Sequence, residues 1–133
     1  MTIRRIKMSS LNCHIVFEVD DTLLCTEKLK FMHERWEGHE HRLEEFHGNM
    51  LHAWLSVVAE WVLLRASYYE DSVNKVIKYF DDGRGEDDGY NMDEGSEGYC
   101  KMDGSVGVRI KSIKRCKISN FTVKENVYKI KGE

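Results

Sequence analysis

The sequence contains no proline, and none of its apolar runs reaches the roughly 18 residues that a membrane-spanning helix requires. Residues Met1 to Met8 are polar and basic and lack the apolar core of a secretory signal. Neither sign of charge dominates, because 20 Lys and Arg oppose 23 Asp and Glu for a net charge of −3. A general nucleic-acid coat protein would be strongly basic, so that class is excluded. We therefore expect a cytoplasmic protein that has no membrane partner and for which nucleic acid is not the favoured partner.

Cysteine is scarce and widely spaced along the chain. The four cysteines form no C-x-x-C pair and match no zinc-binding spacing; they are Cys13, Cys25, Cys100 and Cys116. We expect free thiols in a reducing compartment, and a disulfide between Cys100 and Cys116 stays open as the alternative. The sequence predicts no cofactor and no dedicated metal site.

The chain does contain enough apolar surface for one folded domain. Of its 133 residues, 41% are hydrophobic and 11% are aromatic, and this composition excludes wholesale disorder. A chain of this length buries roughly two thirds of the surface that its unfolded form exposes. We expect a single domain that covers residues 1–133.

Both ends of the chain carry the alternating pattern of half-buried strands. Residues 2–19 predict two strands joined by a hairpin turn near Ser9, Ser10 and Asn12, and residues 106–130 predict two or three more. The apolar positions of the second strand share one face; they are Leu11, Cys13, Ile15, Phe17 and Val19. We predict an α+β fold in which the N-terminal hairpin and the C-terminal strands form an antiparallel sheet covered by helices on one face.

Two long helices and one short helix are predicted between these strands. The first begins at Thr26, bends at Gly38 and ends at residues 47–49, which also cap the next helix. That next helix, Met50–Tyr69, is apolar around more than half of its circumference and should be central. A short helix ends at Phe80. The predicted core residues are Ile15, Phe17, Trp54, Leu55, Val58, Trp61 and Val108.

The composition changes abruptly between Asp81 and Gly104. This stretch holds nine acidic residues against Arg84 and Lys101, together with six of the ten glycines. We predict a long, flexible, acidic, Gly-rich loop over residues 81–104. The candidate partner-binding residues are Asp81, Asp82, Glu86, Asp87, Asp88, Asp93, Glu94 and Glu97.

The string from Glu18 to Leu24 looks like the D-x-D-x-T motif of haloacid-dehalogenase-type phosphatases, in which the first aspartate is the nucleophile. Glu18 occupies that position here, and its extra methylene would displace the attacking oxygen. The chain also has no room for the alternating βαβ units of that family. We therefore predict no catalytic residues, and a turn into the first helix at Asp20, Asp21 and Thr22.

Five histidines gather in the helical region; they are His33, His39, His41, His47 and His52. None of them forms the H-E-x-x-H pattern of zinc proteases. On one continuous helix a stripe of metal-binding side chains could share a face, namely His33, Glu37, Glu40, Glu44 and His47. A metal-binding protein or enzyme built on this helix is an alternative to a solvated polar face.

Two further patterns are weaker. The acidic loop fails as a calcium-binding EF-hand, because a start at Asp93 places Gly95 third and Gly104 twelfth, where oxygen ligands are needed. The basic C-terminal strands, with Phe121 and Tyr128 for base stacking, leave a DNA-binding regulator as a further alternative. The even scatter of the lysines is more typical of a solvated sheet face.

Several strings occur in a characteristic order: T-E-K-L at 26–29, F-D-D-G-R-G at 80–85 and M-D-G-S-V-G-V-R-I at 102–110. Together they resemble an uncharacterised family of small phage- and prophage-encoded proteins, a domain of unknown function. The resemblance covers roughly Thr26 to Ile113. It implies a phage context, no known reaction and no catalytic residues to transfer.

In that context the favoured hypothesis is a non-enzymatic protein that binds a host protein. An acidic loop suits a partner with a basic groove that normally holds nucleic acid. The sharpest form is a counter-defence inhibitor, like an anti-CRISPR protein, that blocks such a groove in a defence complex. A charged solubilising linker without a partner is the alternative interpretation of the loop.

Overall fold

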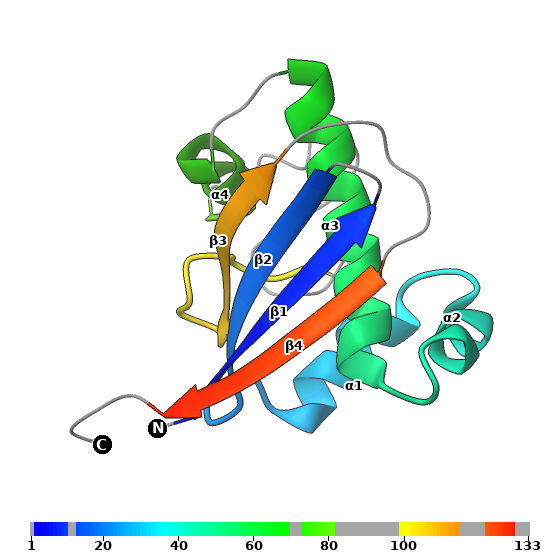
Figure 1. The fold of residues 1–133 in the computed structure, drawn as a ribbon. Coiled ribbons are helices and arrows are strands. Elements are labelled where there is room, and N and C mark those ends of the chain that lie inside the picture. Colours follow the sequence, from blue (N-terminus) through cyan, green and yellow to red (C-terminus); the bar gives the residue numbers. More distant parts are fainter. Residues whose placement is uncertain (1, 11–12, 70–72, 82–98, 115–121, 130–133) are drawn as a thin grey trace.

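The computed structural model describes residues 2–10, 13–69, 73–81, 99–114 and 122–129. Figure 1 shows that strands from both ends of the chain lie side by side in one sheet, and that the helical region between them in sequence packs beside it. The elements are β1 Thr2–Ser10, β2 Cys13–Asp20, α1 Thr26–Glu34, α2 His39–Glu45, α3 Met50–Tyr69, α4 Val73–Asp81, β3 Val108–Lys114 and β4 Thr122–Lys129.

The described strands form one sheet in the order β3-β2-β1-β4, and each neighbouring pair is antiparallel. β1 therefore lies inside the sheet. It pairs with β2, where Met8 faces Ile15, and with β4, where Thr2 faces Lys129. The predicted α+β fold, with hairpin and C-terminal strands in a single antiparallel sheet, is confirmed.

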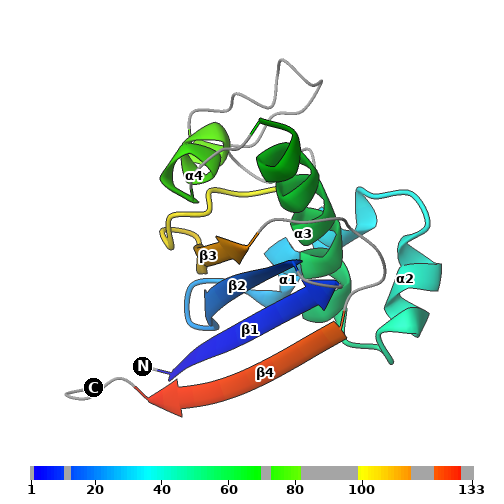
Figure 2. The same ribbon diagram turned by 45° about the horizontal axis from the view of Figure 1, so that its top comes forward.

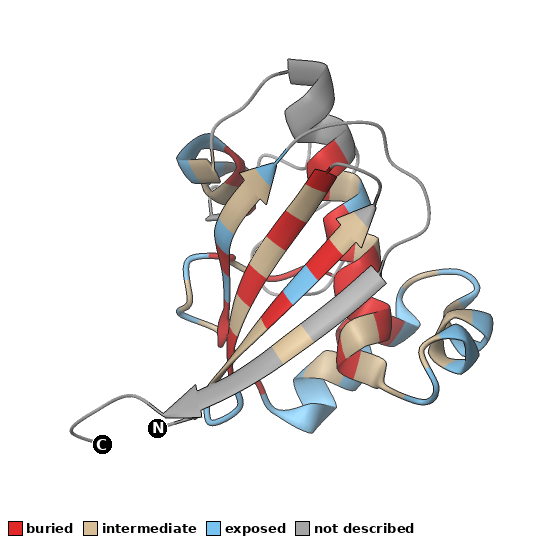
Figure 3. Ribbon diagram, viewed as in Figure 1, coloured by how far each residue is buried: buried red, intermediate tan, exposed pale blue. Residues whose placement is uncertain are grey.

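One face of the sheet forms the floor of the core, and the helices gather on that side (Figures 1 and 2). Buried and more exposed residues alternate along β1 and β2 (Figure 3), because successive side chains of a strand point to opposite faces. Of the predicted core residues, all but Trp61 are buried. Trp61 is only partly buried, since it faces Phe80 and Tyr99 at the edge of the core rather than the sheet.

The helix predicted from Thr26 to residue 46 is two helices. α1 ends at Glu34, and Gly38, with φ of 78° in the left-handed region, starts α2 in a new direction. Cys25 rather than Thr26 caps α1, because its sulfur accepts the Lys28 N–H at 3.4 Å. The predicted cap of α3 is confirmed, since the Asn49 side chain accepts the His52 N–H at 2.9 Å.

Two local features shape the sheet further. The register between β2 and β3 shifts between Val16 and Phe17, whose partners are Ser112 and Ile110, so Lys111 bulges out. The residues between β1 and β2, where a turn was predicted, lie outside the described residues, although Ser9 and Ser10 themselves belong to β1.

No helix in the described part of the chain is both long and apolar enough to cross a membrane.

Candidate functional site

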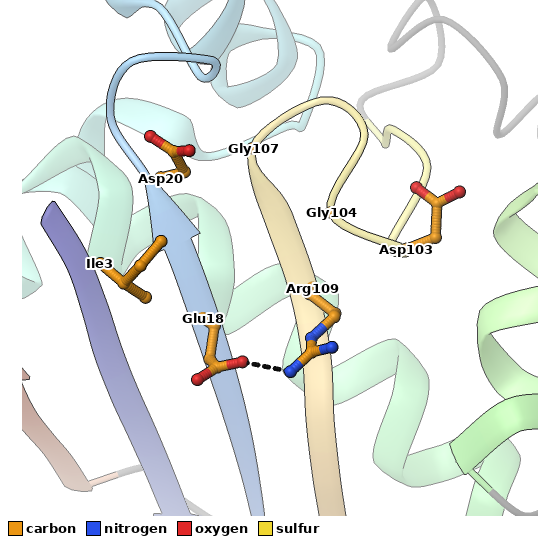
Figure 4. A pocket seen from close by; sticks show the side chains of 7 residues that line it. All are labelled: Ile3, Glu18, Asp20, Asp103, Gly104, Gly107 and Arg109. Carbon is orange, nitrogen blue, oxygen red and sulfur yellow. Dashed lines mark hydrogen bonds and ion pairs between the residues drawn. The ribbon is translucent and has the colours of Figure 1, made fainter. Parts of the chain in front are cut away.

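A pocket of about 450 Å³ lies where β2 ends and β3 begins (Figure 4). Its lining consists of one apolar residue, two glycines and four charged residues: Ile3, Glu18, Asp20, Asp103, Gly104, Gly107 and Arg109. Strand alternation places Ile3, Glu18 and Arg109 on the sheet face opposite the core. The pocket therefore opens on the side away from the described helices.

Glu18 is held between two arginines. Its carboxylate accepts hydrogen bonds from Arg5 at 2.9 Å and from Arg109, which approaches from β3. Figure 4 shows the side chains of Glu18 and Arg109 pointing toward one another. The register explains the contact, because Glu18 faces both Arg5 and Arg109 directly across the sheet. Such a carboxylate is fixed in place by charge-assisted hydrogen bonds.

Asp20, Asp21 and Thr22 form the predicted turn. Asp20 is 8% exposed, and its carboxylate accepts both the backbone N–H of Thr22 at 2.9 Å and the Thr22 hydroxyl at 2.6 Å. This short-range bonding is what an aspartate does at a turn. The described sheet is also antiparallel, unlike a sheet built from the βαβ units of those phosphatases. The string that resembles the phosphatase motif therefore forms the turn between β2 and α1.

The M-D-G-S string forms the opposite wall. The carboxylate of Asp103 accepts the Ser105 N–H at 2.9 Å and the Ser105 hydroxyl at 2.6 Å, and these hydrogen bonds lower the pKa of Asp103. Gly107, with φ of 110°, accepts the Asp20 N–H at 2.8 Å through its carbonyl. A Cβ at Gly107 would lie 2.5 Å from the Leu24 nitrogen, so this turn packs directly on the β2–α1 turn.

The pocket thus presents mixed charge on a rigid rim. Among the residues that line it, no hydroxyl or thiol lies beside a general base, and its carboxylates are held by arginines or by turn hydrogen bonds.

The predicted histidine stripe is not brought together. The break between α1 and α2 separates His33, on α1, from His47, which follows the end of α2, and His33 is buried at 1% exposure while His47 is exposed. The His33 ring packs edge-on against the His39 ring, with the two ring centroids 5.5 Å apart. Burial, with His39 and Arg42 nearby, lowers the pKa of His33. No three His, Cys, Asp or Glu side chains of the described residues converge on a metal position.

Both ends of the stretch predicted as an acidic loop, residues 81–104, belong to the described part of the chain. Asp81 is the last residue of α4, and the residues from Tyr99 onward pack into the core, where Tyr99, Cys100 and Met102 are at most 1% exposed. Their burial follows from being the apolar residues of an otherwise polar stretch. The other candidate partner-binding residues lie outside the described residues; they are Asp82, Glu86, Asp87, Asp88, Asp93, Glu94 and Glu97.

An aromatic cluster that sequence reasoning missed joins the two ends of this stretch. The Phe80 and Tyr99 rings lie 5.5 Å apart, and Trp61 contacts both at 5.2 and 5.8 Å. Trp36 adds an edge-on contact with Tyr99 at 4.9 Å. We call residues 81–98, which run between Phe80 and Tyr99, the acidic segment. The sequence signal for this cluster is the group of apolar residues that follows the acidic segment, namely Tyr99, Cys100 and Met102.

Three of the four cysteines lie within the described residues. Cys13 and Cys100 are buried, and Cys25 is exposed. Burial raises the pKa of Cys100 to about 12, so this thiol stays protonated and unreactive. Cys116, its alternative disulfide partner in the sequence, lies outside the described residues.

Comparison with known proteins decides the family. Residues 14–123 match the family described as Protein of unknown function (DUF2528). The chain belongs to this family. Relatives include Protein ea10 of Escherichia phage lambda and the lambda prophage-derived protein ea10 of Escherichia coli O6:H1, each 34% identical over 99 residues, which are 74% of this chain and 74% of the relative. No solved structure matches the chain.

Membership of the DUF2528 family confirms the resemblance to uncharacterised phage and prophage proteins. The structure explains two of the strings that carried it. T-E-K-L begins α1, and M-D-G-S-V-G forms the turn that Gly107 packs against Leu24. The F-D-D-G-R-G string starts at the buried Phe80 and continues into residues outside the described part.

Proposed function

We propose that this chain is a small, non-enzymatic, phage-type protein that binds a host protein through its acidic segment. Between Phe80 and Tyr99 stand eight acidic residues and one basic residue, Arg84, for a net charge of −7. Since the whole chain carries −3, the remainder carries +4. This segregation of charge is the observation that carries the proposal.

The anchorage of the acidic segment supports it. Phe80 is fully buried and Tyr99 is 1% exposed, so the residues on either side of the segment are fixed in the core. Their rings also contact each other. A loop whose ends are already held together loses less conformational entropy when it is ordered by a partner. Fixed ends therefore lower the entropic cost of ordering the acidic segment on a partner.

The partner we propose is a host protein with a basic groove that normally holds nucleic acid. Seven net negative charges complement such a groove, and long-range attraction accelerates their encounter. Phage and prophage relatives in the DUF2528 family agree with action in the cytoplasm of a host cell. A defence complex blocked in its nucleic-acid channel, in the manner of an anti-CRISPR protein, is the most specific form of the proposal.

Two five-site variants test it. The first neutralises acids of the acidic segment to Asn or Gln, at Asp81, Asp82, Glu86, Asp87 and Asp88. The matched control neutralises five exposed acids of α1, α2 and the turn between them to Gln, at Glu27, Glu34, Glu37, Glu40 and Glu44. Both variants change the net charge by the same amount, so only the location of the charge differs.

The readout is quantitative co-purification from host cells, followed by measurement with the purified partner. We expect wild type and control to retain a partner that excess DNA displaces, and the segment variant to lose it. In cells with a CRISPR defence against a test phage, wild type should raise the plaque count and the segment variant should not. Retention of the partner by the segment variant, or turnover of a substrate by the purified protein, would contradict the proposal.

A further inference from the structure

The face of the sheet opposite the described helices carries cationic positions on all four strands. Side chains alternate along a strand, so the neighbours of buried Ile6, Met8 and Ile15 project from this open face. The cationic positions are Arg5 and Lys7 on β1, His14 on β2, Arg109 and Lys114 on β3, and Lys124 on β4.

The strand register collects four of these positions at one end of the face. Lys7 lies directly opposite Lys124, and His14 lies directly opposite Lys114. Lys7 pairs with Val16, which places it diagonally beside His14. Adjacent strands are only about 4.8 Å apart, and like charges directly opposite one another destabilise a sheet. We call this group, Lys7, His14, Lys114 and the position of Lys124, the lysine end.

The charges of Lys7 and Lys114 are not compensated within the described residues. Both side chains are exposed, and neither makes an ion pair in that part of the chain. Partial burial and the nearby Lys7 and Lys114 lower the pKa of His14. The other end differs, because Arg5 and Arg109 are bound to Glu18 there.

We propose that the lysine end binds the phosphate backbone of single-stranded nucleic acid. The backbone hydrogen bonds of the inner strands are already used within the sheet, so this face offers charge and apolar surface rather than a free edge for a peptide. Val16 is half-buried between the cations and supplies apolar surface for a base. This site is separate from the acidic segment and goes beyond the proposed function.

The width of the sheet favours a single strand over a duplex. Three strand spacings of about 4.8 Å make the face roughly 14 Å wide before side chains are added. The major groove of B-DNA is about 12 Å wide and admits a helix or a two-stranded ribbon. A four-stranded face is too broad to enter it, whereas unpaired bases lie flat on an open sheet.

Fluorescence anisotropy of the full chain with labelled 12-nucleotide oligothymidylate and oligouridylate tests the proposal. Two lysine–phosphate contacts, from Lys7 and Lys114, predict binding about sevenfold weaker in 200 mM than in 50 mM salt, from a slope near −0.7 per contact. Lys7→Gln with Lys114→Gln should weaken binding at least about tenfold at 50 mM salt and reduce the salt effect below about threefold.

The matched control replaces Lys30 and Lys78, exposed lysines of α1 and α4, with Gln, and should bind like wild type. No binding at 50 mM salt, an equal loss in the control, tighter binding of a duplex, or stronger competition by polyglutamate than by oligonucleotide would each overturn the proposal. If the double variant fails to fold, NMR of the wild-type protein decides the question instead. Changes in amide chemical shift that are confined to Lys7, His14 and Lys114 on oligonucleotide addition would support the proposal. The five-site variant of the acidic segment should still bind, which separates this result from the proposed function.

Discussion

The ring of Phe80, at the end of α4, meets the ring of Tyr99 at an interplanar angle of 79° with centroids 5.5 Å apart. Eighteen residues of the sequence, 81–98, separate the two residues that meet at this contact. Edge-to-face packing of this kind adds about 0.5–1.5 kcal/mol beyond the burial of the rings. The contact therefore belongs both to the hydrophobic core and to the base of the acidic segment.

Phe80→Ala should lower the free energy of unfolding by about 3–5 kcal/mol, because a fully buried ring is replaced by a cavity. Urea denaturation followed by tryptophan fluorescence measures this loss. Phe31→Ala is the control, since Phe31 is 52% exposed and its loss should cost about 0.5 kcal/mol or less. Equal effects of the two substitutions would show that the Phe80 ring is not part of the hydrophobic core.

Gly107→Ala should destabilise the fold far more than Gly48→Ala. Both glycines have positive φ, so each substitution carries about 1–2 kcal/mol of backbone strain. At Gly107 the new Cβ also falls 2.9 Å from the Asp20 carbonyl and 2.5 Å from the Leu24 nitrogen, whereas nothing lies within 4 Å at Gly48. The added clash should cost about 1–3 kcal/mol more. Thermal unfolding of the two variants in parallel separates two costs. Both variants carry the backbone strain, whereas only Gly107→Ala carries the steric clash.

Acid should weaken the fold through His33. Burial lowers its pKa, so below the ordinary histidine value of about 6.5 the unfolded chain binds a proton that the folded chain does not. The free energy of unfolding therefore falls as the pH drops from 7 toward 5, by at most about 1.4 kcal/mol per pH unit from this group. His14, whose pKa is also lowered, acts in the same direction.

Urea denaturation at several pH values measures this slope. His33→Gln should reduce the slope, and His41→Gln should leave it unchanged because the side chain of His41 is 78% exposed. A slope that survives His33→Gln in full would assign the acid sensitivity to other groups.

Glu125 should contribute to stability as a link between three elements. It accepts a hydrogen bond from Arg4 of β1 at 3.1 Å and lies 2.7 Å from the ring nitrogen of His52 on α3. Glu125→Ala should lower the free energy of unfolding by about 1–3 kcal/mol, since two polar partners lose a charged acceptor. Glu45→Ala breaks the exposed pair with His41 and should cost about 0.5 kcal/mol or less. Denaturant titration of both variants checks the difference.

The fold was predictable where one periodicity dominates. Alternation in β2 and the apolar helix α3 identify the residues that meet in the core, and burial of Phe17, Trp54 and Val58 follows directly. The division between α1 and α2 was less accessible, because Gly38 lowers helix stability without fixing where the chain turns. In the structure α1 ends at Glu34, and the left-handed Gly38 begins α2 four residues later.

The candidate sites depended on contacts between distant residues. No local pattern indicates that Glu18 will lie between Arg5 and Arg109, since that arrangement comes from strand order and register. The same holds for Lys7 and Lys124, which are scattered in sequence and opposite one another in the sheet. Even scatter of lysines along a chain is therefore a poor guide to their distribution on its surface.

The position of β1 inside the sheet has a consequence for synthesis. Thr2 pairs with Lys129, so this strand acquires its second neighbour only after more than a hundred further residues have left the ribosome. Pairing over such a separation slows folding, because the intervening chain must close before the contact forms. Until β4 arrives, the nascent protein exposes an unfinished edge that other strands can join. Rapid completion of translation, or a chaperone that shields β1, should therefore raise the yield of folded protein.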